Sequence, residues 1–445
     1  MYQGLFDTRT GLSPEDYGKV GTTMAVLLLT WNRWTHRRVE TARFIDADAA
    51  RRSVSVDFTL PYFVHKLRET PEYGTRRQLV PLGLLRKGTL VNFDLRDEAD
   101  NSLPLLTTSQ NGQVAEATLV ALAAAKLELD VIGEAGALQC DIRHLVQAPD
   151  RLEASRALAE LYERRDEFSE LRLRLRDDDA FPAIAAAFAT HFLALTMVEI
   201  ARHQRRVLYY AYDETFFTSP DRSRFLRIAG GQERVVWFSV PRVGDAESYH
   251  HEVEAPDGMQ VNTQLGVRTD RRPASSAPFL RPISKSGNFQ RSHAHFSNAE
   301  PGDEAVIVVK IRPRPSTVIR GALLAGLASL ALIILVFARL GAILAHGGTE
   351  TAATLLLAIP GLAVAVLARD DDTEMTTEIL WPIRVAAMAP GLGAFIAAGA
   401  VVGGGDDTPT KLVLVFAFLV SLLGVIDLLV AFARARRNPP ATEAE

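Results

Sequence analysis

The sequence predicts an α+β head followed by a helical membrane region. Residues 318–433 are dominated by alanine, leucine, glycine, valine and isoleucine, whereas residues 1–314 hold nearly all of the charge. Within the first 315 residues, short runs rich in β-branched and aromatic residues lie on either side of an alanine- and leucine-rich block. Such runs are typical of strands, and leucines at helical spacing are typical of helices.

We therefore expect five regions in the 445-residue chain. They are a β-rich N-terminal part over 1–110, a helical block over 111–205, an antiparallel β-sandwich over 206–315, four transmembrane helices over 318–433, and a basic, then disordered, cytoplasmic tail over 434–445. The formal net charge of −4 gives no footprint for nucleic acid. A single cysteine, Cys140, rules out an internal disulfide framework.

The first region contains the strand candidates VETARFI (39–45) and SVSVDFTL (53–60), separated by a polar turn. The segment 90–107 predicts a hairpin with residues 98–102 at its tip. Residues 24–31 form a short apolar run that lacks the composition of a signal peptide, and its length favours a buried strand.

The helical block is predicted from segments 114–129, 152–164 and 183–203. The run AFPAIAAAFATHFLALTMVEI (180–200) approaches the ~20 residues that a membrane span needs. Because it contains Pro182, His191 and Glu199, we favour a buried core helix over a fifth span.

The β pattern returns after residue 206. Strands are predicted at 207–214, 234–240, 249–254, 258–267, 291–298 and 304–311, with turns at Pro256-Asp257-Gly258 and Pro301-Gly302-Asp303. Six or so strands of this length suggest an immunoglobulin-like or jelly-roll-like sandwich. Residues 270–290, rich in serine, proline and arginine, are expected to form a mobile loop.

Four spans are expected at 318–345, 352–368, 379–402 and 412–432. Positive charge flanks one side of them, which places both termini in the cytoplasm by the positive-inside rule. A lipid-facing basic collar is expected on that side, with the members Arg312, Arg314, Arg320, Arg434, Arg436 and Arg437. The expected location is the bacterial inner membrane, as a multi-pass protein.

Asp427 lies within the last predicted span, and an ionised group at that depth needs a partner. Arg384 enters the third span from the same side and is the preferred partner, in a pair that fixes helix packing. Proton or ion handling by Asp427, or snorkelling of its side chain to the interface, remain alternatives.

Proline–glycine pairs interrupt two of the predicted spans at similar depth, Pro360-Gly361 and Pro390-Gly391. Proline removes an intrahelical hydrogen bond and kinks a helix. Paired interruptions can mark a transporter site. Small residues such as Gly393, Ala397 and Gly399 favour close helix contact instead.

Four histidines, His250, His251, His293 and His295, come nearest to a metal cluster. His293 and His295 share one face of a predicted strand because side chains alternate. The pair could bind zinc if a third ligand such as His251 approached. Nothing in the sequence fixes that separation, so we expect ordinary sheet-face histidines, and neither a metal nor another cofactor.

Two further groups have structural explanations. Asp94, Asp97, Glu98 and Asp100 cluster at a hairpin tip without the glycine and glutamate of a calcium loop, which favours a solvated turn. Cys140, with Asp141 and His144 nearby, favours an inert thiol over a nucleophile. The sequence contains no GxSxG, GxxxxGK or strand–GxGxxG–helix motif.

The stretches VSVDFTLP, VPLGLLRKGTLVNFDLRDEADNSLPLLTTSQN and HFSNAEPGDEAVIVVKIRPRPSTVIRGALL resemble segments of uncharacterised multi-span membrane proteins of actinobacteria. The resemblance covers most of the chain. It implies a bacterial inner-membrane location and no particular activity.

Together these patterns predict a non-enzymatic membrane protein. The head is expected to bind a protein or a small ligand, and the spans to anchor it in the lipid bilayer, with a homo-oligomer as one possible assembly. The alternatives are a gated pore or small transporter controlled by the head, and a membrane-tethered enzyme with an unrecognised site.

Overall fold

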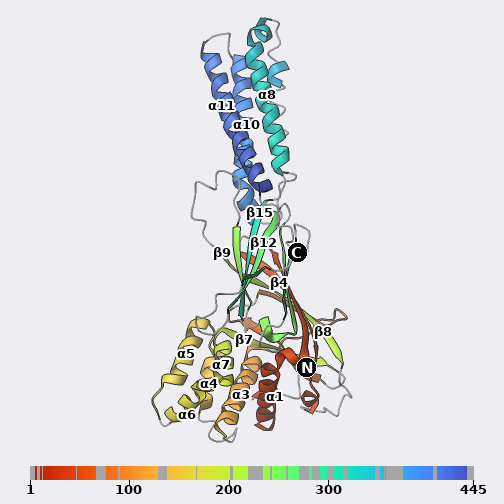
Figure 1. The fold of residues 1–445 in the computed structure, drawn as a ribbon, viewed down its shortest axis with the longest axis vertical. Coiled ribbons are helices and arrows are strands. Elements are labelled where there is room, and N and C mark those ends of the chain that lie inside the picture. The colour runs from red at the N-terminus through yellow and green to blue at the C-terminus, as the bar shows by residue number, and fades with distance from the viewer. Residues whose placement is uncertain are drawn as a thin grey trace.

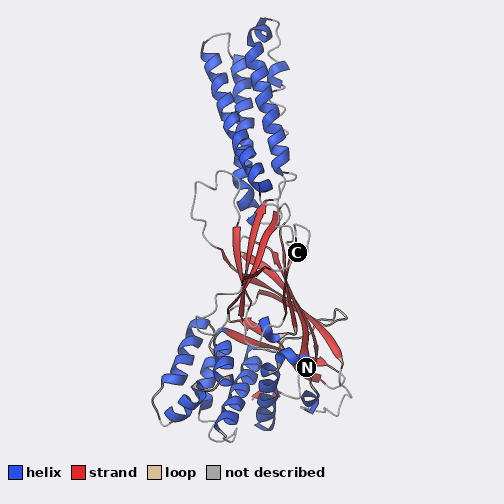
Figure 2. Ribbon diagram, in the orientation of Figure 1, coloured by secondary structure: helices blue, strands red, loops and turns tan. Residues whose placement is uncertain are grey.

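The structure, a computed structural model, describes most of the chain. The described residues are 6–7, 11–12, 14–46, 48–66, 77–88, 91–128, 138–166, 168–200, 204–218, 234–240, 243–256, 259–269, 280–282, 291–297, 304–313, 318–345, 351–354, 356, 374–403 and 408–437. Figure 1 shows three parts along the long axis of the molecule: a block of helices at one end, β-sheets in the middle and a bundle of long helices at the other end. Figure 2 shows how the strands fill the space between the two helical parts.

The larger sheet has six strands in the order β14-β11-β3-β4-β8-β6. Their bounds are β3 Thr35–Phe44, β4 Ala49–Thr59, β6 Val91–Arg96, β8 Arg205–Thr215, β11 Ser248–Glu254 and β14 Arg291–Ser297. Neighbouring strands are antiparallel except β3 and β11, which are parallel. This sheet joins strands from the first hundred residues to strands after residue 204.

The second sheet has five strands in the order β13-β12-β15-β10-β9, all antiparallel. Their bounds are β9 Phe217–Thr218, β10 Arg234–Val240, β12 Met259–Thr269, β13 Leu280–Pro282 and β15 Glu304–Pro313. The expected sandwich within residues 206–315 is not confirmed, because β8, β11 and β14 pair into the six-stranded sheet. Apart from β13, the expected loop at 270–290 lies outside the described residues.

The six-stranded sheet contributes to two apolar cores through one of its faces. At one end, Val54, Val56 and Phe58 of β4 pack into the core of the helical block. At the other end, Phe44 lies 5.3 Å from Phe216 and 6.0 Å from Phe238 between ring centroids, in the core shared with the five-stranded sheet. The inner face of this sheet therefore ties the helical block to the second sheet.

The apolar run at 24–31 was predicted as a strand, and this prediction is wrong. It lies mainly in helix α1 (Pro14–Leu29), followed by a short helical turn α2 (Trp31–Trp34). Val20, Met24, Leu27 and Leu28 are buried at helical spacing. The helix packs closely on α3 (Thr108–Leu127), where a Cβ added at Gly21 would overlap the carbonyl of Ala117.

Residues 180–200 do not form one core helix. They form helix α7 (Ala180–Thr190) followed at once by strand β7 (His191–Glu199). Strand β7 pairs with β5 (Arg77–Arg86) across a register shift at Pro81 and Gly83. An 11-residue helix is too short to span a bilayer, so no fifth span exists here. The expectation of burial is confirmed, since Phe181, Leu193 and Leu195 belong to the core.

The remaining helices of the block are α4 (Gln139–Gln147), α5 (Arg151–Glu163) and α6 (Ser169–Arg176). Helix α3 begins with a capping box, in which Thr107 and Gln110 satisfy each other's backbone N–H groups. The helices predicted at 114–129 and 152–164 are thus confirmed within a few residues as α3 and α5.

Three described helices are long and apolar enough to span a membrane. They are α8 (Val318–Ala345), α10 (Glu374–Gly403) and α11 (Thr408–Arg437). Most of the predicted second span at 352–368, including Pro360 and Gly361, lies outside the described residues. Large apolar side chains such as Leu324, Phe395 and Leu423 are more than 60 % exposed on the outside of the bundle, as a lipid-facing surface requires.

Glycines let the three helices approach closely. A Cβ added at Gly424 of α11 would come within 2.7 Å of Pro390 and 2.8 Å of the Ala386 carbonyl oxygen on α10. Gly326 of α8 faces the same proline and Val425. Gly393 faces Ala417 and Ser421, whereas no atom lies within 4 Å of a Cβ added at Gly399. Small residues therefore serve close helix contact at three of these positions.

The bundle and the five-stranded sheet share a core. Ile319 of α8, Ile383 of α10 and Leu428 of α11 are buried in the same cluster as Ile307 and Ile311 of β15. A 30-residue helix is about 45 Å long, whereas the hydrocarbon layer of a bilayer is about 30 Å thick. Helices α10 and α11 are thus long enough to cross a bilayer and still reach the sheet.

Candidate functional site

The six-stranded sheet carries polar groups of the same types on its two faces. Side chains alternate along each strand, so Arg38, Glu40 and Arg52 lie on the inner face together with His251, whereas Arg37, Arg51 and His250 lie on the outer face. Both faces contain histidine, arginine and acidic residues. Their surroundings decide which face can bind a ligand.

On the inner face, an ionic belt of Arg38, Glu40, Arg52 and Glu214 lies between the two apolar cores. Arg38 Nε donates to Glu40 Oε1 over 2.8 Å, and Arg52 Nε lies 3.1 Å from Glu40 Oε2. Arg52 Nη1 lies 2.9 Å from Glu214 Oε2, and Arg38 Nη2 donates to the Tyr210 hydroxyl over 3.0 Å. The belt is therefore internally paired.

In the ionic belt, the neighbouring positive charges determine the direction in which the pKa of Glu40 shifts. Burial alone would raise the pKa of Glu40, but Arg52, Arg38 and His251 lower it to about 2. Burial also raises the pKa of Tyr249 well above its ordinary value. Glu40 and Arg52 are 3 % and 5 % exposed, so a ligand has no access to them. The belt is structural.

His251 belongs to this inner face, away from His293 and His295. Its ring is fully buried and lies 5.5 Å from Phe238 between centroids. Burial and the charge of Arg52 lower its pKa to about 3, against the opposing effect of Glu40. The structure thus separates His251 from the two histidines with which a zinc site was considered.

The outer face contains a shallow hollow with a cavity volume of about 290 Å³. Its floor consists of short side chains from three adjacent strands, and larger side chains of β6 and β8 stand beside it. The floor residues are Val39, Thr41, Ser53, Ser55 and Ala211, and the larger residues are Asp94, Arg96 and Tyr209. Arg96 Nε donates to Asp94 over 2.9 Å, which holds both groups in place.

A cluster of Ser248, His250, His293 and His295 lies on the same face, next to the hollow. His250 pairs with His295 of β14 on one side and with Val39 of β3 on the other. Their side chains form a hydrogen-bonded chain. His293 Nε2 lies 2.8 Å from His250 Nδ1, His250 Nε2 lies 2.9 Å from Ser248 Oγ, and Ser248 Oγ lies 3.1 Å from His295 Nε2.

His250 is uncharged at neutral pH. Burial, His295, Arg37 and His293 all lower its pKa, to about 4. Neutral imidazoles can satisfy the chain in two opposite directions, because each ring has one donor and one acceptor nitrogen. The nitrogens bond to one another and to Ser248 and do not converge on a point. Accordingly, the described residues include no group of three or more His, Cys, Asp or Glu side chains that could hold a metal ion.

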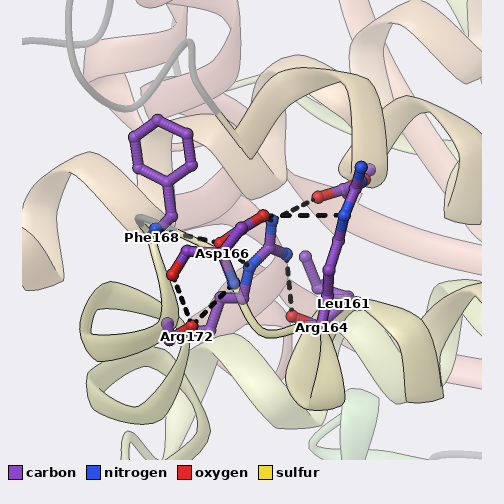
Figure 3. A network of polar contacts seen from close by, with 7 residues as sticks. Leu161, Arg164, Asp166, Phe168 and Arg172 are labelled. Atoms are coloured by element: carbon purple, nitrogen blue, oxygen red, sulfur yellow. Dashed lines mark hydrogen bonds and ion pairs between the residues drawn. The ribbon is translucent and has the colours of Figure 1, made fainter.

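The charged groups of the helical block serve its architecture. Arg172 is 1 % exposed and binds Asp141 at 2.7 Å, Asp166 at 3.0 Å and the Leu161 carbonyl at 2.9 Å (Figure 3). Asp141 pairs with Arg172 and Arg164, and Cys140 is exposed. His144 lies 3.9 Å from Glu153.

The acidic hairpin is held by its own turn. Asp97 accepts hydrogen bonds from the Asn101 side chain at 3.0 Å and from the backbone N–H groups of Asn101 and Ala99, both at 2.9 Å. The bond from the Asn101 side chain, followed by the backbone bonds, lowers the pKa of Asp97. Arg96 pairs with Asp94 and Asp100, and Arg206 pairs with Glu98. All four carboxylates thus have hydrogen-bond or ion-pair partners nearby.

In the bundle, Asp427 and Arg384 lie at the same level of the antiparallel α10–α11 pair. Their neighbours Leu428 and Ile383 are both buried in the core shared with the sheet. Each of the two charged residues makes at least one polar or electrostatic interaction. Pro390 and Gly391 lie one to two turns further along α10, and the Pro390 carbonyl accepts a 3.5 Å hydrogen bond from Ser421.

The six arginines of the expected basic collar lie in different settings. Arg312 is 6 % exposed on β15, and its guanidinium lies within hydrogen-bonding distance of the Gln260 side-chain amide. Arg320 is exposed in the first turn of α8. Arg434, Arg436 and Arg437 lie in the last turns of α11, and Arg314 lies outside the described residues. Arg312 therefore points into protein.

Comparison of the chain with protein-family models and with curated proteins finds no match. The site therefore rests on geometry alone. Sequence reasoning singled out His250, His293 and His295 but missed Ser248, Tyr209 and the floor of the hollow. Alternation within each strand would have placed these residues on one face, but only the pairing of β3 with β11 brings them together.

Proposed function

We propose that this protein is a membrane-anchored binding protein whose head holds a small polar ligand in the hollow on the outer face of the six-stranded sheet. The observation that carries the proposal is the hollow itself, with its volume of about 290 Å³. Ligand sites are concave and largely preformed, with a few fixed polar groups against apolar surface.

The lining suits a ligand with both donors and acceptors. Thr41, Ser53 and Ser55 provide hydroxyl groups in the floor, and Asp94 and Arg96 provide a fixed acceptor and a fixed donor at the side. The exposed ring of Tyr209 offers an apolar surface beside them. Backbone rigidity comes from the sheet, so binding requires little ordering of the site.

The membrane region supports four crossings. Helix α8 begins beside the sheet at Ile319. At the far end of the helix, Leu340 is buried in a separate apolar core that lies within the bundle, together with Leu356 and Leu414. Helix α10 begins again beside the sheet, where Leu380 and Ile383 are buried. We therefore propose a fourth crossing between α8 and α10, and the apolar composition of residues 352–368 supports assigning it to that segment.

The same geometry supports placing both termini on one side. Leu428 of α11 is buried in the sheet-proximal core, so the last helix ends near the head. The basic residues near that end, including Arg320 and Arg437, favour the cytoplasm. We propose the bacterial inner membrane. Reporter fusions before Met1 and after Glu445 should both report a cytoplasmic location, and a periplasmic signal from either contradicts the topology.

In the bundle, the proposal assigns Asp427 and Arg384 to a pair that fixes the α10–α11 contact at the head end. The close approach at Gly326, Gly393 and Gly424 supports an anchor more than a gated pore. Flux through reconstituted protein that is lost in Asp427→Asn would favour the pore. Assembly as a homo-oligomer is compatible with either role.

Thermal-shift measurements on the full-length protein in detergent test the binding role. Nucleotides, sugar phosphates, amino acids and short peptides serve as probes. Ala211→Trp fills the hollow, and Ala159→Trp on the exposed side of α5 is the matched control. We expect at least one probe class to stabilise the wild type and Ala159→Trp but not Ala211→Trp. Stabilisation by no class, or stabilisation that persists in Ala211→Trp, contradicts the proposal.

A further inference from the structure

Ser248 lies between two imidazoles on the outer face of the sheet, at the start of β11. Its Oγ is 2.9 Å from His250 Nε2, and the other nitrogen of that ring is 2.8 Å from His293 Nε2. The order is thus hydroxyl, imidazole and a third group that holds the imidazole. Ser248 is half-buried and His295 is exposed, so the hydroxyl lies at the surface of the protein.

We propose that Ser248, His250 and His293 form a nucleophile, a general base and a positioning residue, which give the outer face of the head acyl-transfer activity toward small esters.

The contacts satisfy the geometric requirements for an activated serine. A nucleophile and its base must lie within about 2.6–3.2 Å of each other, and a further group must orient the base. A triad is recognised by geometry and roles and not by position in the sequence. The ring planes of His250 and His293 differ by only 18°. In the productive direction, Ser248 O–H donates to His250 Nε2, and His250 Nδ1–H donates to His293 Nε2.

We assign to Arg37 the positive charge that offsets the negative charge developed in the reaction. It is the direct neighbour of Ser248 in the parallel β3–β11 pair and lies on the same face. Its charge already acts on His250. Strand β11 is paired on both sides, with β3 and β14, so its backbone N–H groups are committed to the sheet. A side-chain cation is therefore the available stabiliser for an oxyanion.

The reaction proceeds in two balanced halves. Ser248 Oγ attacks the ester carbonyl carbon while His250 Nε2 takes the hydroxyl proton. The carbon–oxygen bond to the alcohol then breaks, and the alcohol leaves with that proton. Water attacks the resulting acyl-serine, again giving its proton to His250, and the carboxylic acid leaves as Ser248 recovers the proton. No oxidant, reductant or further co-reactant is needed.

The hollow next to the cluster offers room for a short acyl chain. Val39, in the floor of the hollow, is the direct neighbour of His250, so an acyl chain bound at Ser248 can extend over short side chains. The inference does not require that the hollow binds the polar ligand of the proposed function. Its failure would leave the binding proposal standing, and the reverse also holds.

The pH dependence separates this cluster from an ordinary surface histidine. His250 is faced by Ser248 and Glu252 on β11, by Arg291, His293 and His295 on β14, and by Arg37 on β3. Because the pKa of His250 is lowered to about 4, the base stays unprotonated well below pH 6. Reaction at Ser248 should therefore persist at pH 5 and fall as the pH approaches 4.

The test uses the full-length protein in detergent and a fluorophosphonate probe, which forms an Oγ–phosphorus bond on a nucleophilic serine and releases fluoride. We expect one adduct, mapped by mass spectrometry to Ser248, and its loss in Ser248→Ala. Ser109→Ala, at an exposed serine in the first turn of α3, is the matched control and should label like the wild type. Hydrolysis of p-nitrophenyl acetate should follow the same order.

The histidine variants separate roles from folding. His250→Gln should label about 100-fold more slowly, the low end of what a positioned base contributes. His293→Ala should slow labelling and shift its pH midpoint, whereas His293→Asn, whose amide can accept from His250, should recover part of the rate. The proposal is overturned if the wild type is not labelled, if the adduct lies on other residues, or if labelling is equal after heat denaturation. All three results are measured on the wild-type protein, so they do not depend on the folding of a variant.

Discussion

The two faces of the six-stranded sheet use the same residue types for opposite purposes. Arg51 and Arg52 are neighbours in β4, and His250 and His251 are neighbours in β11, yet one member of each pair faces inward and the other outward. Inward, arginine and histidine are buried among fixed charges that join two cores. Outward, Arg51 pairs with Asp213 at a partly exposed position, and His250 lies within hydrogen-bonding distance of the Ser248 hydroxyl. Surroundings and not residue type decide whether these groups are buried in a paired network or left accessible at the surface.

The sharpest test of this comparison removes the inner arginine. Arg52→Met should lower the free energy of unfolding by about 3–5 kcal/mol, because Glu40 is left as a buried charge with a partner missing. Chemical unfolding of the full-length protein, followed by the fluorescence of buried Trp31 and Trp34, measures the loss. The double variant Glu40→Gln/Arg52→Met should recover part of the stability. A near-neutral Arg52→Met would show that the belt is dispensable.

As the pH falls, His251 on the inner face should cost more stability than His250 on the outer face, although both losses begin near pH 6.5. The folded pKa of His251, about 3, lies below its ordinary value of 6.5, so the unfolded chain binds a proton first. The stabilising contribution is complete above pH 6.5 and is lost as the pH falls toward 3. His251→Gln should flatten the dependence of the melting temperature on pH between 6.5 and 4. We expect His250→Gln to flatten it less, and the opposite order contradicts the assignment of faces.

The neighbouring outer arginine should matter far less. Arg51 pairs with Asp213 at 2.9 Å at a partly exposed position, and such pairs contribute about 0.2–1 kcal/mol. Arg51→Met should therefore lower the free energy of unfolding by no more than about 1 kcal/mol in the same assay. A loss as large as that of Arg52→Met would mean that the two faces are equally structural.

The floor of the hollow should be almost silent in stability. Ser53→Ala removes a partly exposed hydroxyl and should change the free energy of unfolding by no more than about 0.5 kcal/mol. Any probe that stabilises the wild type in the thermal-shift assay should stabilise this variant less. If Ser53→Ala lowers the free energy of unfolding but leaves the stabilisation by the probe unchanged, the hollow has a structural role.

Local patterns predicted most strands but not their neighbours. The strand predicted at 234–240 coincides with β10, and the one at 249–254 lies within β11. The parallel pairing of β3 and β11 joins segments about 200 residues apart, and no local pattern encodes it. Because of this pairing, β11 and β14 belong to the six-stranded sheet and not to a separate sandwich within residues 206–315.

The two errors in the head have a common cause. Residues 24–31 are mostly apolar even at the exposed positions Val26 and Leu29, and residues 180–200 are also mostly apolar, so the sequence pattern could not separate helix from strand. The chain changes from helix to strand at His191, where β7 pairs with β5. Pro81 and Gly83 make β5 hard to recognise as a strand from its sequence.

The candidate site was predictable in part. Alternation correctly placed His293 and His295 on one face, and the register then selected His250 and not His251 as their neighbour. Ser248 carries no sequence motif, so only the distances to both imidazoles identify it.

The apolar cluster that joins Ile311 of the sheet to Leu428 of the last helix has a mechanical consequence. A domain joined to its membrane anchor only by a flexible linker can rotate independently of the anchor. Here the sheet and the helix ends share a core, so a change in the twist of the sheet displaces the helix ends. A movement of the five-stranded sheet can therefore reach the bundle as a displacement of packed side chains within this shared core.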